Sequence, residues 1–137
     1  MSTIKTNTLT GTTSAGSIVV TGEGGSTTTN LQQGLVKSWV NFDGSATDAA
    51  ARDSFNVSSM ADRGTGLSTI TLSNAMGNSN YVGTTSCMGT WADDDGRNYI
   101  AVAMPKDADE VYVNQFGTGG SAADGAYVGV DITGDLA

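Results

Sequence analysis

The segment Val36–Phe42 alternates strictly between two sets of side chains, and this alternation limits what the chain can fold into. Successive side chains of a β-strand point to opposite faces, so a period of two residues predicts an extended strand with two unlike faces. One face carries Val36, Ser38, Val40 and Phe42, and the other carries Lys37, Trp39 and Asn41. Because Trp39 and Phe42 lie on opposite faces, we interpret both as packing residues in a core or an interface rather than as a ligand platform.

Short strands with turns between them are predicted along the rest of the chain. An apolar run at residues 54–57, a glycine turn at 63–66 and the segment Leu67–Leu72 together predict a β-hairpin. Residues 43–52, between the first strand and this hairpin, are expected to form a surface loop. Further strands are expected at residues 81–91, 98–104, 110–116 and 126–133. This regular spacing predicts an all-β fold, either an antiparallel β-sandwich or a barrel-like body.

Residues 1–30 differ from the rest of the chain because Thr, Ser and Gly dominate them. Their apolar residues are few, namely Ile4, Leu9 and the run at 18–20, so the segment cannot bury enough surface to offset its own ordering entropy. The segment is therefore either disordered or ordered against a partner, and its many β-branched Thr residues favour the second alternative. Residues 31–35 would join it to the body as one helical turn or as a bend.

The change in composition divides the chain into an extended Thr/Gly-rich N-terminal arm, residues 1–35, and an antiparallel β body, residues 36–137. Such a body has strand edges, which natural proteins normally cover. We therefore expect a homotrimer in which three arms pair or wrap around the threefold axis. The alternative is that the arm orders on the surface of a larger assembly.

The charge of the chain argues against nucleic acid as a partner. Six Lys and Arg against fourteen Asp and Glu give a formal net charge of −8, which repels phosphate backbones. The adjacent charges Arg52–Asp53 and Asp62–Arg63 are expected to form local ion pairs of small value. The longest aliphatic run near the N-terminus, residues 18–20, is far short of a membrane span or the core of a signal peptide. We expect the chain to be synthesised in the cytoplasm, and we expect that it does not insert into a membrane.

The chain contains no histidine, which excludes Ser-His-Asp and Cys-His catalytic arrangements and argues against the common zinc sites. Cys87 is the only cysteine, so we expect a buried, inert thiol and no internal disulfide. A carboxylate pair acting on a glycosidic bond is the least favoured hypothesis, because the Asp residues lie mostly in Gly-rich turns, where Asp bonds to the local backbone. We therefore expect no enzymatic activity, no catalytic residue, no metal and no cofactor.

The predicted hairpin tip at residues 91–99 is the leading candidate for a ligand-binding surface, because binding residues gather on loops held by strands. It combines aromatic, acidic and donor groups that could hold a sugar ring: Trp91, Asp94, Arg97 and Tyr99. The favoured alternative is that Trp91 and Tyr99 pack on each other as cross-strand neighbours. The acidic run at 93–95 lacks the EF-hand spacing, since Val102 holds the place of the required glutamate, so a plain acidic turn is favoured over a calcium site.

Five short motifs cover much of the chain and carry a family resemblance. They are MSTIKTNTL at the start, GLVKSWVNFDG (34–44), RDSFNVSSMADRGTG (52–66), NYVGTTS (80–86) and AYVGVDITGDLA (126–137). This series resembles a module of tail-fibre-type and related structural proteins of tailed bacteriophages, especially marine ones. No catalytic signature is part of the resemblance.

The resemblance implies a non-enzymatic virion protein: a homotrimeric, fibre-tip-like protein on the particle surface whose exposed loops contact a host glycan. Because residues 1–35 stand where such fibres usually carry a longer shaft or attachment domain, a capsid decoration (cement) protein or a short head fibre that stabilises the shell is the alternative. In either case the partners would be further copies of the chain and other capsid or tail proteins, and the location would be the virion.

Overall fold

The computed structural model describes residues 3–89 and 99–137, and the regular structure in these ranges consists of β-strands and one short 3-10 turn, η2 (Thr118–Gly120). All strand pairs formed in these ranges are antiparallel, so the prediction of an all-β fold with antiparallel sheets is confirmed. The chain separates into two units, residues 1–35 and 36–137. No helix in the described ranges is long and apolar enough to span a membrane.

The first unit contains a small β-hairpin. Strand β1 (Val19–Thr21) pairs with β2 (Thr28–Asn30). Across the described part of this unit, residues 3–35, every residue is exposed or partly exposed and none is buried. The first unit therefore has no core of its own.

A hydrogen-bonded turn over residues 31–35 follows this hairpin. The backbone N–H of Gly34 donates to the carbonyl oxygen of Asn30 at 3.2 Å, and the Asn30 side-chain oxygen accepts from the backbone N–H of Gln33 at 3.1 Å. The sequence left open whether residues 31–35 form one turn or a bend, and the structure contains a hydrogen-bonded turn.

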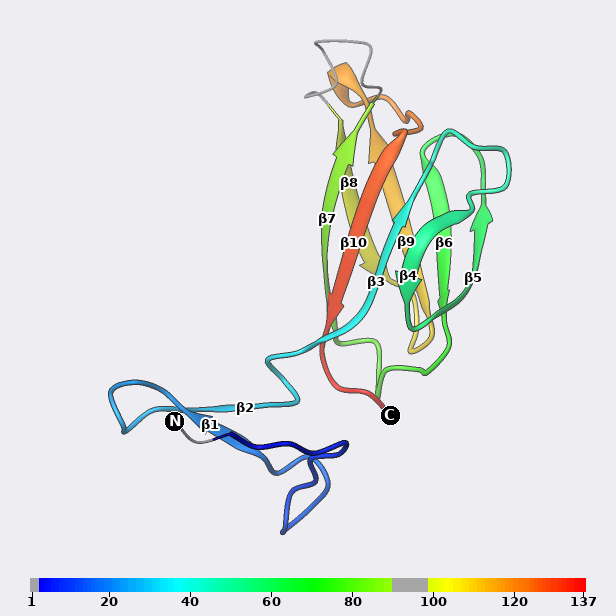
Figure 1. The fold of residues 1–137 in the computed structure, drawn as a ribbon. Coiled ribbons are helices and arrows are strands. Elements are labelled where there is room, and N and C mark those ends of the chain that lie inside the picture. Colours follow the sequence, from blue (N-terminus) through cyan, green and yellow to red (C-terminus); the bar gives the residue numbers. More distant parts are fainter. Residues whose placement is uncertain (1–2, 90–98) are drawn as a thin grey trace. The chain divides into compact units, whose positions relative to one another are not determined.

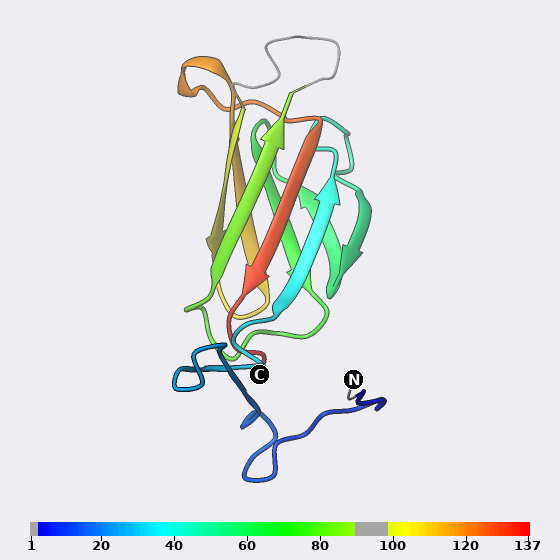
Figure 2. The same cartoon turned by 60° about the vertical axis from the view of Figure 1, so that its left-hand side comes forward.

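The second unit is a sandwich of two four-stranded sheets, with strand orders β4-β3-β10-β7 and β5-β6-β9-β8 in the described residues (Figure 1). In Figure 2 the first sheet faces the viewer, with β10 lying between β3 and β7. The sheets do not close into a barrel, so the sandwich is the form observed. The strands are β3 (Val36–Phe42), β4 (Ala51–Phe55), β5 (Val57–Asp62), β6 (Leu67–Leu72), β7 (Val82–Met88), β8 (Ile100–Pro105), β9 (Glu110–Phe116) and β10 (Tyr127–Thr133).

One side of the sandwich is closed by a chain segment that passes from one sheet to the other at Asn56. This residue stands between β4 and β5 and has a φ of 58°, a left-handed conformation that Asn tolerates better than most residues. The predicted hairpin is present as β5 and β6, but its first strand begins at Val57, because the chain turns a corner at Asn56 within the apolar run at 54–57. The predicted loop at 43–52 is also shorter, because Ala51 and Arg52 already belong to β4.

The opposite side of the sandwich is closed where β7 meets β8. Thr85 Oγ1 donates to the carbonyl oxygen of Ala101 at 2.5 Å. A methyl group built on Gly83 would lie 2.5 Å from Cβ of Ala103, so only small side chains fit between these two strands. The larger side chains of β8 consequently point outward and are exposed: Ile100, Val102 and Met104.

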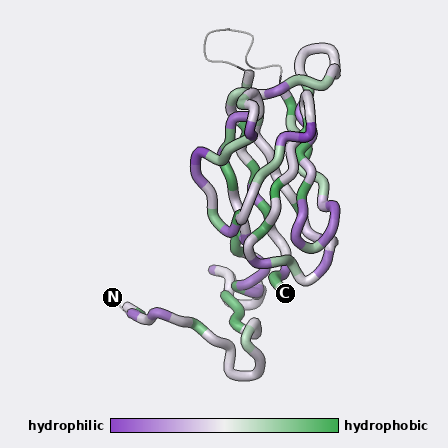
Figure 3. The backbone as a smooth tube through the Cα atoms, turned by 90° about the vertical axis from the view of Figure 1, so that its right-hand side faces the viewer, coloured by the Kyte–Doolittle hydropathy of each residue, from purple (hydrophilic) through white to green (hydrophobic). Residues whose placement is uncertain are grey.

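The core fills the space between the sheets with alternate residues of the strands. Its buried side chains are Val40, Phe42, Ile70, Leu72, Met76, Tyr81, Ala101, Val111, Val113, Val128, Val130 and Ile132. Hydrophobic stretches accordingly follow the strands in Figure 3, and hydrophilic stretches follow the loops. Phe42 is fully buried, as the alternation of Val36–Phe42 predicts, whereas Trp39 lies on the outer face of the same sheet and is only partly buried.

Candidate binding surfaces

The predicted tip at residues 91–99 is described only in part. Trp91, Asp94 and Arg97 lie outside the described residues, as does the acidic run at 93–95. Tyr99 is described and partly buried, and its ring lies over Gly89, where an added methyl group would come within 2.6 Å of the ring carbon Cε2. Tyr99 therefore has a packing role against a glycine backbone.

Within residues 3–89 and 99–137, no three His, Cys, Asp or Glu side chains are grouped so that they could hold a metal ion. Cys87 lies on β7 and packs against the core. Burial raises the pKa of the Cys87 thiol above its ordinary value of 9.0, which keeps the thiol protonated and unreactive near neutral pH.

The outer face of the first sheet carries a hollow of about 290 Å³ over its three neighbouring strands β3, β10 and β7. The antiparallel register arranges its outward side chains in two rows that run across these strands. Asn41, Gly129 and Ser86 form the first row, and Trp39, Asp131 and Thr84 form the second. The hollow therefore has an aromatic side chain, a carboxylate, an amide and two hydroxyl groups around it.

Gly129 forms the floor of this hollow in the middle of β10. A methyl group built on Gly129 would lie 2.6 Å from the hydroxyl oxygen of Ser86. Gly129 is not among the described glycines with positive φ, so the backbone conformation does not require glycine here. A glycine inside a paired strand weakens the strand and often marks a place where another group approaches the backbone closely. At this position the missing side chain leaves room for the Ser86 hydroxyl on the outer face.

The aromatic surface continues beyond the hollow on β4. Phe55 lies directly opposite Trp39 in the β3–β4 register and is 54% exposed. Asp53 lies opposite Asn41 in the next outward row. The face therefore presents aromatic and acidic groups side by side.

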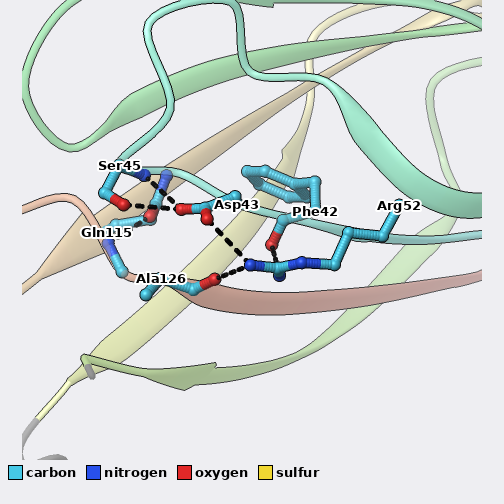
Figure 4. A network of polar contacts seen from close by, with 7 residues as sticks. Phe42, Asp43, Ser45, Arg52, Gln115 and Ala126 are labelled. Atoms are coloured by element: carbon cyan, nitrogen blue, oxygen red, sulfur yellow. Dashed lines mark hydrogen bonds and ion pairs between the residues drawn. The ribbon is translucent and has the colours of Figure 1, made fainter. Parts of the chain in front are cut away.

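A polar network at one end of the sandwich joins β4 to β3 and β10, two of the three strands that line the hollow (Figure 4). Arg52 Nη1 donates to the carbonyl oxygen of Phe42 at 2.9 Å, and Nη2 donates to Asp43 Oδ2 at 2.8 Å and to the carbonyl oxygen of Ala126 at 2.7 Å. These contacts join β4 to the end of β3 and the start of β10. The guanidinium carbon also lies 4.5 Å from the centre of the Tyr127 ring, a cation–π distance.

Asp43 is held in its ionised form by this network. The Ser45 hydroxyl donates to Asp43 Oδ1 at 2.6 Å, and this bond, with the nearby Arg52 charge, lowers the pKa of Asp43 below its ordinary value of 3.8. The predicted Arg52–Asp53 pair is therefore wrong, because Arg52 pairs with Asp43.

The predicted Asp62–Arg63 pair is not formed either. Asp62 accepts a hydrogen bond from the backbone N–H of Gly64 at 2.8 Å, and the Arg63 guanidinium lies 6.0 Å from the centre of the Tyr112 ring. Both charges thus serve local turn and surface contacts.

A second hollow, of about 330 Å³, lies beside β4 and β5. Its lining consists mainly of Ala and Ser residues with Asp48, Val57 and Met60, and no aromatic residue is among the described residues that line it. It therefore has fewer distinctive groups for recognition than the hollow over Gly129.

The hollow over Gly129 was not predicted from the sequence. The single signal available was a glycine in the middle of the Val-rich run at 126–133, and it becomes informative only when Asn41 and Ser86 are known to flank it.

Comparison of the chain with protein-family models, with curated proteins and with solved structures finds no match.

Proposed function

We propose that this chain is a non-enzymatic bacteriophage virion protein, attached through residues 1–35 and displaying its β-sandwich, residues 36–137, on the particle surface. The observation that carries the proposal is the contrast between the two units. The sandwich has a buried core of its own, whereas no residue in the described part of the first unit is buried. The motif resemblance to tail-fibre-type proteins supports a virion as the particle concerned.

The first unit exposes apolar side chains that an assembled particle would cover. Ile4 is 84% exposed, Leu9 59% and Val19 56%. Burial of such side chains against a partner is favourable by about 25 cal/mol per Å² of apolar surface. A single two-stranded hairpin is also only marginally stable by itself. Both points support the proposal that residues 1–35 become fully ordered only when they bind a partner.

The fibre-tip form of the proposal is a homotrimer, and we assign the contact between copies to the outer face of β8 instead of to the arms, because the strands of the first unit pair with each other within one chain. Ile100 is 63% exposed, Val102 44% and Met104 37%, and the three form one apolar row along an edge strand. Exposed apolar rows of this kind mark interaction surfaces. The net charge of −8 opposes association of copies through charged surfaces, so an uncharged row is the more favourable contact.

Light scattering on the purified full chain tests the trimer. The expected mass is three times the monomer mass, and Val102→Glu is expected to reduce it to the monomer. Ala61→Glu, at an exposed position of β5 in the same sheet and opposite the uncharged Thr69, serves as the control and should remain trimeric. A monomer for the unaltered chain at micromolar concentration would contradict the trimer.

The attachment role is tested by expressing a C-terminally tagged chain in the infected host and measuring tagged copies in purified particles. Val19→Asp combined with Val20→Asp, in the full chain, should abolish incorporation while the circular dichroism of the sandwich stays unchanged. The control Thr21→Asp combined with Thr29→Asp adds the same charge to the same hairpin, spares its apolar residues and does not place the two carboxylates opposite each other. Equal incorporation of the Val variant and the unaltered chain would contradict attachment through this unit.

A capsid decoration protein or a short head fibre is the second candidate, and the exposed apolar side chains of the first unit favour it, because a shell surface can cover them as well as further copies of the chain can. This candidate needs no host ligand, because its work is to hold shell subunits together. The fibre-tip form, by contrast, contacts a host glycan. Removal of the chain should lower the thermal stability of the head under the second candidate and reduce adsorption to host cells under the first.

A further inference from the structure

We propose that the hollow over Gly129 is a saccharide-binding site that takes a ring of a neutral glycan against Trp39. The inference deepens the proposed host-glycan contact and rests on it for its biological setting. It assigns that contact to the outer face of the sheet β4-β3-β10-β7 instead of to the residues predicted from the sequence, Trp91, Asp94, Arg97 and Tyr99. Binding of the saccharide can be measured on the purified chain without virus particles.

The first argument is that the space is built into the sheet. Gly129 lies in a strand paired on both sides, with Asn41 and Ser86 as its direct neighbours. A methyl group at this position would lie 2.6 Å from the Ser86 hydroxyl as that side chain now stands, so a side chain here would have to displace the hydroxyl and would raise the floor of the hollow. Because no positive φ explains this glycine, we assign its role to the outer face, where the backbone of β10 is covered only by the Ser86 hydroxyl and not by a side chain of its own.

The second argument is that the groups around the hollow match both surfaces of a sugar. A pyranose ring has carbon–hydrogen faces that stack on an aromatic ring, and Trp39 supplies that ring at one wall. The hydroxyl groups of the sugar need donors and acceptors around their edge. Asp131 supplies carboxylate acceptors, Asn41 supplies an amide donor and acceptor, and Thr84 and Ser86 supply hydroxyl groups that do both.

The third argument concerns charge and selects neutral saccharides over acidic ones. Asp131 lines the hollow, and Asp53 stands in the adjoining outward row, whereas Lys37, on the same face of β3, is buried and does not line the hollow. The chain as a whole carries a net charge of −8. A uronic or sialic acid brought to this face would meet like charges, and like-charge contacts oppose binding.

The fourth argument is that the site is rigid before a ligand arrives. Its residues lie on three adjacent strands, and β10 is paired with β7 along the whole range Tyr127–Thr133. Arg52 further ties the start of β10 to β3 and β4 through the carbonyl oxygens of Ala126 and Phe42. A site on paired strands loses little conformational entropy on binding. Its volume of about 290 Å³ suits a short stretch of glycan.

The experiment is a titration of the ¹⁵N-labelled full chain with a panel of hexasaccharides, followed by NMR. The neutral probes are maltohexaose, cellohexaose, mannohexaose and chitohexaose, and the acidic probe is hexagalacturonate. We expect at least one neutral probe to shift the Trp39 indole N–H and the Gly129 backbone N–H. Trp39→Ala should weaken that binding by about tenfold or more, as truncation of a central aromatic contact does.

Two further variants make the test independent of the stability of Trp39→Ala. Gly129→Ala fills the floor of the hollow and leaves Trp39 in place, and the flexible Ser86 side chain can rotate away from the new methyl group. It should also weaken binding by about tenfold or more. Trp91→Ala is the matched control, since it removes the other tryptophan of the chain, and it should change affinity by less than about twofold.

The inference is overturned if no neutral probe shifts either resonance at about 10 mM, a concentration that reveals even millimolar dissociation constants. It is equally overturned if Trp91→Ala abolishes binding while Gly129→Ala retains it, because the ligand would then sit at the tip. Preferential binding of hexagalacturonate would contradict the charge argument. None of these outcomes depends on incorporation into particles, so failure of this site and failure of the virion role remain separate results.

Discussion

The guanidinium group of Arg52 donates a hydrogen bond of 2.7 Å to the backbone carbonyl oxygen of Ala126, a residue 74 positions later in the chain. The same group bonds Asp43 and the carbonyl oxygen of Phe42, so one side chain joins β4 to the ends of two other strands. We expect Arg52→Ala to lower the free energy of unfolding by about 1–3 kcal/mol, because three hydrogen bonds from a charged donor are lost. Urea denaturation followed by circular dichroism measures this.

Arg63→Ala is the matched control for that prediction. Arg63 contacts the Tyr112 ring from 6.0 Å on the surface, and its removal should change the unfolding free energy by less than about 0.5 kcal/mol. Equal effects of the Arg52 and Arg63 variants would show that the network at the end of the sandwich contributes nothing beyond ordinary surface contacts.

The two aromatic residues of β3 should differ sharply in their effect on stability. Phe42 is fully buried between the sheets, so Phe42→Ala should lower the unfolding free energy by about 3–5 kcal/mol. Trp39 lies on the outer face and is partly buried, so Trp39→Ala should lower it by about 1–2 kcal/mol. Denaturant titration of both variants checks the order. A larger loss for Trp39→Ala would mean that this face is covered.

Two substitutions of Asn56, at the corner between β4 and β5, should separate the contribution of backbone strain to the unfolding free energy from that of hydrogen bonding. Its Nδ2 donates to the carbonyl oxygens of Lys37 at 3.0 Å and Asn74 at 3.1 Å, and its φ is 58°. Its Oδ1 also accepts from the backbone N–H of Asn74 at 2.8 Å and from the Asn74 side-chain amide at 2.9 Å. Asn56→Ala should lower the unfolding free energy by about 2–3 kcal/mol, because it loses these four side-chain bonds and keeps an unfavourable φ. Asn56→Gly loses the same bonds without the strain and should be about 1 kcal/mol less damaging. Identical unfolding midpoints for the two variants would show that this φ carries no strain.

Tyr81 should make the sandwich sensitive to high pH. Its hydroxyl lies 3.0 Å from the carbonyl oxygen of Asp107 and 2.9 Å from that of Glu110, at the end of the sandwich opposite Arg52. Burial, together with the charges of Asp107 and Asp109, raises the pKa of Tyr81 from 10.0 to about 12. The folded state therefore holds this proton more tightly than the unfolded chain does.

The consequence is a loss of stability as the pH rises from 10 towards 12, with no contribution from Tyr81 to the pH dependence below that window. Urea unfolding at intervals across the window measures the slope. Tyr81→Phe should flatten it, and Tyr112→Phe, which leaves Tyr81 in place, should retain it. A slope that is the same in the Tyr81→Phe variant and the unaltered chain would assign it to other groups.

Local alternation predicted a large part of this fold. The segments Val36–Phe42, Leu67–Leu72 and Glu110–Phe116 form strands over the predicted ranges, and Val111 and Val113 are fully buried as their spacing indicates. The period of two residues was sufficient here because each strand has one face in the core and one face outside.

Features that depend on which strands are neighbours could not be predicted in this way. The inward face of β8 carries Ala101 and Ala103 because Gly83 and Thr85 of β7 lie against them, and nothing within β8 itself indicates that. The hollow over Gly129 has the same origin, since its walls come from β3 and β7. Of the predicted tip residues, only Tyr99 is described, and it packs over Gly89.

The most direct test of the proposed virion role is negative-stain electron microscopy of particles purified from a host that expresses the chain with a gold-binding tag after Ala137. The tag follows the sandwich, so a displayed body places gold on the outside of the particle. We expect gold at fixed sites, at the tail tip for a fibre-tip protein or over the head for a decoration protein. Particles without gold, with the tagged chain left entirely in the soluble fraction, would contradict the account.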